Sequence, residues 1–211
     1  MGDRRQSSGL RIWPFIIVVL FVGVLYSAVS ETVTIGPSWT TLAIIVGFLI
    51  PFSIAVVLKH HGWIRRIALI LIFLLTVALI SNVASLVLAL FRHQPHAKVL
   101  FYDAVLLWVA NVFVFALWYW SIDQGGAYRR YHHRLQPIDF LFPQMTTDEE
   151  VWHDWKPSFV DYLFVAFNTN TAFSPTDTLI MSRRVKVLVM TQAAVSLVIV
   201  AVLAARAISM V

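Results

Sequence analysis

Hydroxyl, amide and carboxylate side chains gather in one short polar stretch of this chain, between two apolar segments. Oxygen atoms of such side chains, together with backbone carbonyls, replace the hydration shell of a cation in membrane channels. A carboxylate at the mouth of a pathway attracts cations towards it. The pattern therefore indicates an ion pathway that continues into the following apolar segment. The candidate ion-pathway residues are Thr169, Asn170, Thr171, Ser174, Asp177, Gln192 and Ser196.

A short helix is predicted directly before this polar stretch. Ser158 followed three residues later by Asp161 is the pattern of a helix N-cap with an acidic residue in the first turn. Apolar residues then recur at helical spacing, until Asn, Thr and Ser residues and finally Pro175 favour an end near Asn168. A helix over residues 159–168 is about 15 Å long, which is half of the roughly 30 Å thickness of the hydrocarbon core.

Residues 157–182 are accordingly predicted to re-enter the membrane as a half-length helix followed by an extended polar loop. The C-terminus of such a helix carries a partial negative charge, which favours cations at the centre of the membrane. Non-helical backbone at that depth is tolerated only where protein buries it or where it lines a watery cavity. The same residues also fit an amphipathic helix on the cytoplasmic surface, followed by a turn at residues 174–177.

Five longer apolar runs are near or above the roughly 20 residues that a membrane-spanning helix needs. Hydrophobic residues make up 59% of the 211-residue chain and charged residues only 13%, whereas soluble domains carry about 25% charged residues. The sequence therefore predicts an all-α integral membrane protein with five transmembrane helices plus the short re-entrant segment. The predicted spans are residues 12–29, 39–58, 67–91, 99–122 and 185–210.

The first run has some features of a signal peptide, because basic residues precede it and Ala28-Val29-Ser30 ends it. Its apolar length exceeds the about 7–15 residues of a signal, so we expect an uncleaved anchor. With a cytoplasmic N-terminus, ten Lys and Arg residues before and between the runs lie inside and two lie outside, which is a positive-inside bias. The chain then divides into a four-span domain (residues 1–122), a basic cytoplasmic or interfacial connector (123–156) and a C-terminal unit (157–211).

Polar residues also occur inside the apolar runs. Asn82 and Asn111 lie near the middle of the third and fourth runs. We expect a hydrogen bond that packs these two helices together, with a solute site as the alternative. Asp103 lies just inside the outer end of the fourth run and is expected to pair with Lys98 or Arg92.

Other kinds of site are not expected. The absence of cysteine excludes disulfides, thiolate metal sites and thiol catalysis. Pro95 interrupts any helical face shared by His93 and His96, so no metal site is expected there. No nucleophile–base set or nucleotide-binding loop is present, so we expect neither an enzyme nor a cofactor. The basic residues lie between apolar runs, which indicates contact with the lipid bilayer rather than with nucleic acid.

The order Tyr-Leu-Phe-Val-Ala-Phe-Asn-Thr-Asn-Thr-Ala-Phe-Ser-Pro-Thr-Asp at residues 162–177 resembles the pore helix and filter of the potassium-channel superfamily. In that superfamily a short helix leads into a Thr-x-Gly-Tyr-Gly-Asp filter before an inner helix. The resemblance covers residues 157–207 and implies a monovalent cation as the conducted species. This chain departs from the pattern because it has no glycine after Gly126.

Most of the chain is also similar to an uncharacterised family of short, multi-span bacterial inner-membrane proteins, known only as a domain of unknown function. The matching residues are Asp161-Tyr-Leu-Phe164, the stretch 169–177 and Ser182-Arg-Arg184. This resemblance implies a location in the bacterial cytoplasmic (inner) membrane and brings no established activity.

We therefore expect an oligomeric, channel-like protein that conducts cations or small polar solutes along residues 157–182 and the last span. A homo-oligomer is expected because one copy has too few helices to enclose a pore of this kind. The alternative is a non-conducting scaffold, sensor or accessory subunit, in which residues 157–182 are a packing or docking element.

Overall fold

The computed structural model describes residues 13–31, 33–34, 37, 39–58, 60–91, 97–126, 130, 138–175 and 177–208. The basic residues before the first run, Arg92, His93 and His96 lie outside these residues. The α-helices are α1 (Trp13–Ala28), α2 (Trp39–Val57), α3 (His61–Phe91), α4 (Ala97–Ile122), α6 (Phe159–Ala172) and α7 (Arg183–Ile208). The short elements are the 3-10 turns η1 (Asp123–Gly125), η2 (Pro143–Met145) and η3 (Glu150–Trp152) and the strands β1 (Phe140–Leu141) and β2 (Leu179–Ile180).

Four of these helices are long and apolar enough to cross a bilayer, namely α2, α3, α4 and α7. Many large apolar side chains on their outer faces are exposed, such as Phe73 at 57% and Met190 at 67%. Exposed apolar surface of this extent is typical of contact with lipid. The chain is therefore a mostly helical membrane protein. Helix α1 is also apolar but has 16 residues, which gives a length of about 24 Å.

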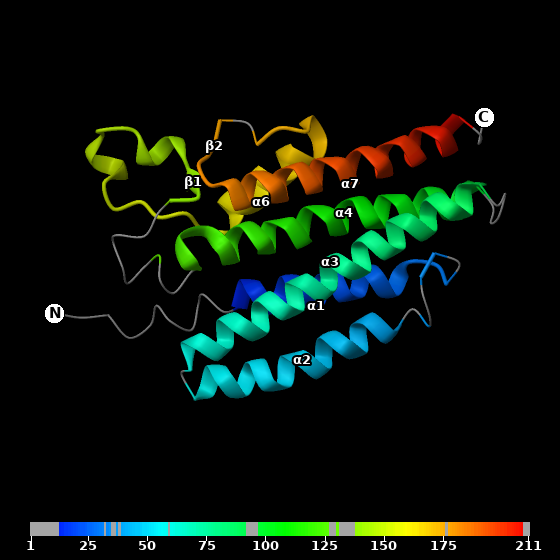
Figure 1. The fold of residues 1–211 in the computed structure, drawn as a ribbon, viewed down its shortest axis with the longest axis horizontal. Coiled ribbons are helices and arrows are strands. Elements are labelled where there is room, and N and C mark those ends of the chain that lie inside the picture. Colours follow the sequence, from blue (N-terminus) through cyan, green and yellow to red (C-terminus); the bar gives the residue numbers. More distant parts are fainter. Residues whose placement is uncertain are drawn as a thin grey trace.

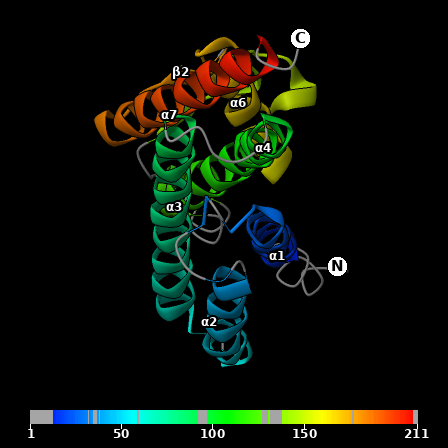
Figure 2. The ribbon, with the colours of Figure 1, turned by 90° about the vertical axis from the view of Figure 1, so that its right-hand side faces the viewer.

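The helices lie roughly side by side, with α4 in the middle of the bundle (Figure 1). Helix α4 packs against α1, α3, α6 and α7, whereas α2 contacts α1 and α3 at the edge. Figure 2 shows α6 and α7 on one side of the molecule and α2 on the opposite side. The central position explains why Leu107, Ala110 and Phe115 of α4 are completely buried.

Helix α1 is an integral part of this bundle. Its Tyr26 is fully buried and donates a hydrogen bond to the backbone oxygen of Leu75 in α3, at 2.9 Å. Gly23 lets α2 approach closely, because a Cβ at this position would lie 2.7 Å from the Ile45 side chain and 2.9 Å from that of Leu42. Small residues allow the same close approach of helices in membrane proteins generally.

The expected pairing of Asp103 with Lys98 is wrong, and the alternative partner Arg92 lies outside the described residues. The Asp103 carboxylate instead accepts hydrogen bonds from the Ser30 backbone nitrogen at 3.0 Å and from the Ser30 hydroxyl at 2.5 Å. Ser30 follows α1, so this contact fixes the end of α1 to the first turns of α4. A carboxylate with only 3% exposure is satisfied here by neutral donors.

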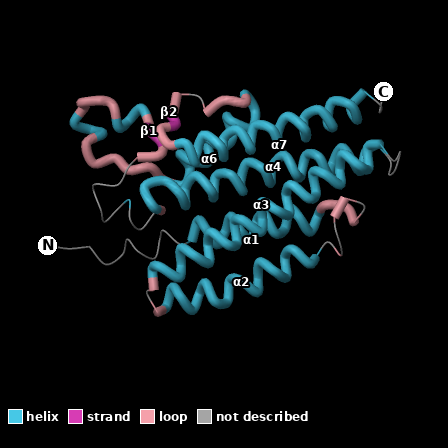
Figure 3. Tube along the Cα trace, in the orientation of Figure 1, coloured by secondary structure: helices cyan, strands magenta, loops and turns pink. Residues whose placement is uncertain are grey.

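The described part of the connector between α4 and α6 is mostly loop and short turns, drawn in pink and cyan in Figure 3. Its strand β1 pairs with β2, which lies just before α7, in an antiparallel register of Phe140 with Ile180 and Leu141 with Leu179. This two-residue ladder is an addition to the expected all-α architecture. It attaches the connector to the chain between α6 and α7.

Helix α6 begins as predicted and ends later than predicted. The predicted cap is confirmed, because the Ser158 backbone nitrogen and hydroxyl donate to the Asp161 carboxylate at 2.6 and 2.7 Å. The predicted end near Asn168 is wrong, because the helix continues to Ala172. Phe173 then adopts a left-handed conformation with φ of 56°, which is a common way for a helix to end.

Candidate functional site

Helix α6 runs antiparallel to α4 and starts beside its end. Near the start of α6, the Tyr162 hydroxyl donates to the carboxylate of Asp123, the first residue after α4, at 2.5 Å. Near its end, Asn170 contacts Asn111 in the middle of α4. Twelve residues separate Asn111 from Asp123 in the sequence, which corresponds to about 18 Å of helix. Helix α6 therefore reaches about half-way along α4.

After α6 the chain goes back to the end of the bundle where α6 began (Figure 1). The Met181 backbone nitrogen, just after β2, donates to the Asp139 backbone oxygen at 2.9 Å, and the Asp139 nitrogen donates to Asp123 at 3.0 Å. The seven steps of chain from Ala172 to Leu179 reach at most about 23–25 Å. The chain after α6 is therefore just long enough to run back along the helix, whose length is about 21 Å. We call residues 173–178 the returning segment.

Asn170 on α6 is the centre of a buried group of polar side chains. Its side-chain oxygen accepts from Asn111 Nδ2 at 2.5 Å, and its own Nδ2 donates to the backbone oxygen of Trp108 at 3.2 Å. Its backbone oxygen accepts from the Ser196 hydroxyl of α7 at 2.6 Å. Asn170 thus connects α6 to both neighbouring helices.

Gln192 on α7 makes the second set of contacts in this group. Its side-chain oxygen accepts from the Tyr119 hydroxyl at 2.6 Å, and its Nε2 donates to the Ala166 backbone oxygen at 2.8 Å. Its backbone oxygen accepts from Asn111 Nδ2 at 3.4 Å. We call these residues the amide network, and each is completely buried: Asn111, Tyr119, Asn170, Gln192 and Ser196.

The amide network explains why α6 is longer than predicted. Asn and Thr residues favour helix ends when their side chains compete for backbone groups. Here Asn170 has partners on two other helices, and the Thr169 hydroxyl donates to the Val165 backbone oxygen in its own helix at 2.8 Å. Because neighbouring helices satisfy the polar side chain of Asn170, the backbone of this stretch remains helical.

The candidate ion-pathway residues divide into two groups in the structure. Four are completely buried, and three are exposed at the end of α6 and in the returning segment. The buried group is Thr169, Asn170, Gln192 and Ser196. The exposed group is Thr171, Ser174 and Asp177.

The expected hydrogen bond between Asn82 and Asn111 is wrong. Asn111 donates to Asn170 and to the Gln192 backbone instead. Asn82 is 3% exposed, and its Nδ2 has no hydrogen-bond partner among the described residues. The depths of the two asparagines along their helices were similar enough to suggest a pair, but Asn111 faces α6 and α7.

A second polar cluster holds the start of α6, and we call it the charged cluster. Asp123 is completely buried, and Arg130 lies 3.6 Å from its carboxylate with a side chain that is 1% exposed. The Arg130 guanidinium also donates to the backbone oxygens of Asp123 and Trp120 at 3.0–3.3 Å, and it lies 5.0 Å from the ring centre of Tyr162. The terminal nitrogens of Arg130 thus combine hydrogen bonds with charge pairing, whereas its buried Nε has no partner among the described residues.

Asp139 extends the charged cluster to α7. Arg184 donates from Nε to Oδ1 of Asp139 at 3.0 Å and from its terminal nitrogen to Oδ2 at 2.5 Å. This two-point geometry is the strongest form of an Arg–carboxylate pair. Arg184 remains 55% exposed, whereas Asp139 is 2% exposed. The charged cluster therefore joins the ends of α4, α6 and α7 through the connector.

Sequence reasoning treated the connector as a basic surface loop and missed the charged cluster. One signal was present, because Asp123 directly follows a long apolar run, where an acidic residue needs a partner. The identity of that partner is a tertiary property, since Arg130, Asp139 and Tyr162 lie 7, 16 and 39 residues away.

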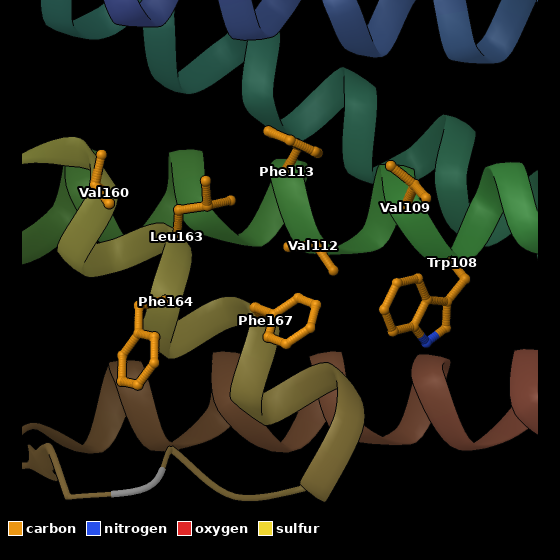
Figure 4. A pocket seen from close by; sticks show the side chains of 8 residues that line it. All are labelled: Trp108, Val109, Val112, Phe113, Val160, Leu163, Phe164 and Phe167. Atoms are coloured by element: carbon orange, nitrogen blue, oxygen red, sulfur yellow. The ribbon is translucent and has the colours of Figure 1, made fainter.

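An apolar groove of about 380 Å³ lies on the outer side of α4 and α6 (Figure 4). Aromatic and aliphatic side chains from both helices form its walls. A second groove, of about 590 Å³, lies between α3 and α7 and is apolar as well. Neither groove presents the polar lining that an ion needs. The first is lined by Trp108, Val109, Val112, Phe113, Val160, Leu163, Phe164 and Phe167.

Among the residues that the structure describes, no group of three or more His, Cys, Asp or Glu side chains is placed to hold a metal ion. No known protein family, curated protein or solved structure matches this chain.

Proposed function

We propose that this chain is the subunit of an oligomeric, channel-like membrane protein that conducts cations or small polar solutes. One observation carries the proposal: α6 begins and the returning segment ends at the same end of the bundle, while the tip of α6 lies level with Asn111 in mid-α4. In a bilayer this arrangement is a re-entrant half-helix. Such half-helices line pathways because they bring a helix end and irregular backbone to the membrane centre.

The chemistry at the tip of α6 favours cations. The last carbonyls of a helix carry a partial negative charge, and this helix end lies near the middle of the neighbouring span. The exposed side chains beside it supply further oxygen atoms. Thr171 and Ser174 carry hydroxyls, and Asp177 lies further along the returning segment towards its mouth.

This proposal refines the pathway expected from the sequence. The side chains that meet the conducted species are Thr171, Ser174 and Asp177. The buried residues of the amide network hold α6 at its depth, because their hydrogen bonds are made to other helices. Gln192 and Ser196 then act as supports for the pathway.

The topology proposed for this chain places the starts of α6 and α7 on the cytoplasmic side. Basic residues at the ends of the apolar runs support that orientation through the positive-inside rule. Helix α1 would be a fifth span, anchored by Tyr26 and Ser30 to the rest of the bundle. The resemblance to bacterial inner-membrane proteins supports the bacterial cytoplasmic membrane as the location.

Ion flux from liposomes that contain the purified protein tests the proposal. We expect a potassium or sodium gradient to drive flux above that of empty vesicles, with a several-fold reduction by Asp177→Asn because a carboxylate near the mouth concentrates cations. Glu31→Gln is the matched control, since it removes an exposed carboxylate after α1. Flux equal to that of empty vesicles, or an equal effect of both variants, would reject the pathway.

A second candidate function is a non-conducting scaffold, sensor or accessory subunit. The buried hydrogen bonds of the amide network favour it, since they suit a fixed packing element as well as a pathway. This candidate expects a folded, stable protein without flux. Measuring flux and unfolding on the same preparation distinguishes the two functions.

A further inference from the structure

Two patches of opposite charge lie at the end of the bundle where α6 and α7 begin. The acidic patch is on the connector and the basic patch is on the first turn of α7. All members of both patches are exposed. The acidic patch consists of Asp148, Glu149, Glu150 and Asp154, and the basic patch of Arg183, Arg184 and Lys186.

These patches do not neutralise each other within one copy. In the described part of the chain, Arg184 is the only member with an ion pair, and its partner is Asp139 of the charged cluster. Asp139 of the connector contacts Arg184 at the start of α7, but Figure 2 shows the outer part of the connector, residues 143–154, on the other side of α6 from the start of α7. The two patches therefore lie on different flanks of the same subunit.

The face between the two flanks is incomplete in a single copy. Phe173 and Ser174 are exposed directly after the helical backbone of α6 has ended, and Thr171 is exposed in its last turn. In hydrocarbon, non-helical backbone must be covered by protein or face water. In the topology proposed above, lipid alone does not satisfy this face.

We propose that a second copy of this chain covers it in a head-to-tail arrangement, with the acidic patch of one subunit against the basic patch of the next. This inference rests on the proposed function, because it takes α6 to lie at membrane depth. A contact between two different patches is heterologous, and repeated heterologous contacts form a ring when the rotation between subunits closes and an open filament when it does not. Such a ring would place α6 and the returning segment of every subunit in equivalent positions.

The charges set the register of this contact more than its strength. Exposed ion pairs contribute little to affinity, but complementary patches orient partners and exclude wrong contacts. Most of the buried area would come from the exposed apolar side chains of α6 and α7, such as Phe164 and Met190, at 54% and 67% exposure. Exposed alanine residues of α7, such as Ala201 and Ala204, allow close packing.

Disulfide crosslinking tests the arrangement cleanly, because the chain has no cysteine of its own. Two full-length variants, Glu150→Cys and Lys186→Cys, are made separately, mixed, reconstituted together and oxidised. We expect a crosslinked dimer in the mixture and its loss when either variant is oxidised alone. Arg66→Cys, an exposed position at the start of α3, replaces Lys186→Cys in the control mixture and should give no dimer.

Three crosslinking or binding results would overturn the arrangement. A dimer from Lys186→Cys alone means a symmetric contact, and no dimer in any mixture means that these patches do not meet. If Arg183→Glu with Lys186→Glu abolishes binding to vesicles of anionic lipid but leaves the oligomer unchanged on a sizing column, the basic patch binds lipid headgroups instead. Flux without crosslinking rejects only the arrangement, whereas crosslinking without flux rejects only conduction.

Discussion

Helix α6 is held at two places, and the two polar clusters that hold it use different chemistry. At its start, the charged cluster contains carboxylates and guanidinium groups. Twelve residues deeper along α4, the amide network contains only neutral amides and hydroxyls. Charged groups thus hold α6 at the end of the bundle, and neutral polar groups hold it deeper inside.

The difference reflects the free energy of burying charge. An ion in a low-dielectric interior loses its hydration, and a partner compensates only when the geometry and hydrogen bonding are good. At the end of the bundle the connector and solvent supply such partners, as the half-exposed Arg184 shows. In the middle of α4 only the neighbouring helices can supply partners for a polar side chain. Neutral amides and hydroxyls form hydrogen bonds there without burying a net charge.

Removing the carboxylate of the charged cluster should have the largest effect. Asp123→Ala leaves Arg130 buried without its partner and removes the acceptor for Tyr162, so the free energy of unfolding should fall by about 3–5 kcal/mol. Denaturant unfolding in detergent measures the change. The control Glu31→Ala removes an exposed carboxylate and should change stability little. An equal, small loss for both variants would show that the charged cluster does not hold α6.

Removing the central amide should have an intermediate effect. Asn170→Leu takes the partner from Asn111 and leaves buried polar groups unsatisfied, which should lower the free energy of unfolding by about 1–3 kcal/mol. Asn168→Leu is the matched control, because Asn168 donates only to the Phe164 backbone oxygen of its own helix among the described contacts. If the control destabilises the protein as much as Asn170→Leu does, the network adds nothing beyond helix propensity.

A single hydroxyl of the network should have a smaller effect. Ser196→Ala removes one hydrogen bond to the Asn170 backbone oxygen, and the expected loss is about 1 kcal/mol. Ser53→Ala, at an exposed position of α2, is the control in the same thermal unfolding assay. If Ser53→Ala shifts the melting temperature as much as Ser196→Ala does, the hydrogen bond from Ser196 to Asn170 does not stabilise the fold.

The smallest change in stability is expected outside both clusters, at Thr171. Its hydroxyl donates to the Phe167 and Asn168 backbone oxygens of its own helix, so Thr171→Ala should change the free energy of unfolding by less than about 0.5 kcal/mol. Liposome flux should nevertheless fall, because this hydroxyl belongs to the proposed pathway. Ser27→Ala, whose hydroxyl donates to its own helix in α1, is the control for both measurements. Unchanged flux in Thr171→Ala removes Thr171 from the pathway.

The apolar helices and the start of α6 could be predicted because their signals are local. Uninterrupted apolar runs indicate α2, α3, α4 and α7, and Ser158 with Asp161 marks the first turn of α6. The end of α6 could not be predicted in the same way. Local preference favours an end at Asn168, whereas Asn111 and Ser196 supply partners that outweigh this preference.

The candidate site was predicted as a list of polar residues without their arrangement. Sequence position placed Thr169 and Thr171 together, two residues apart, yet one is buried in the bundle and the other is exposed. Helical geometry turns neighbouring side chains to different faces, and only the packing of α4 and α7 decides which face is covered. Asp123 was overlooked because its partners come from the connector and α6.

By itself, the sequence determined that this chain is a mostly helical membrane protein with a short helix and a polar stretch before its last apolar helix. Charge-free apolar length and helix capping are properties of consecutive residues, so they can be read without a fold. The tertiary structure alone decided which polar side chains hold α6 and which remain on its surface. Those partners come from α4, α7 and the connector, far apart in sequence, and a buried polar group is stable only where such partners meet it.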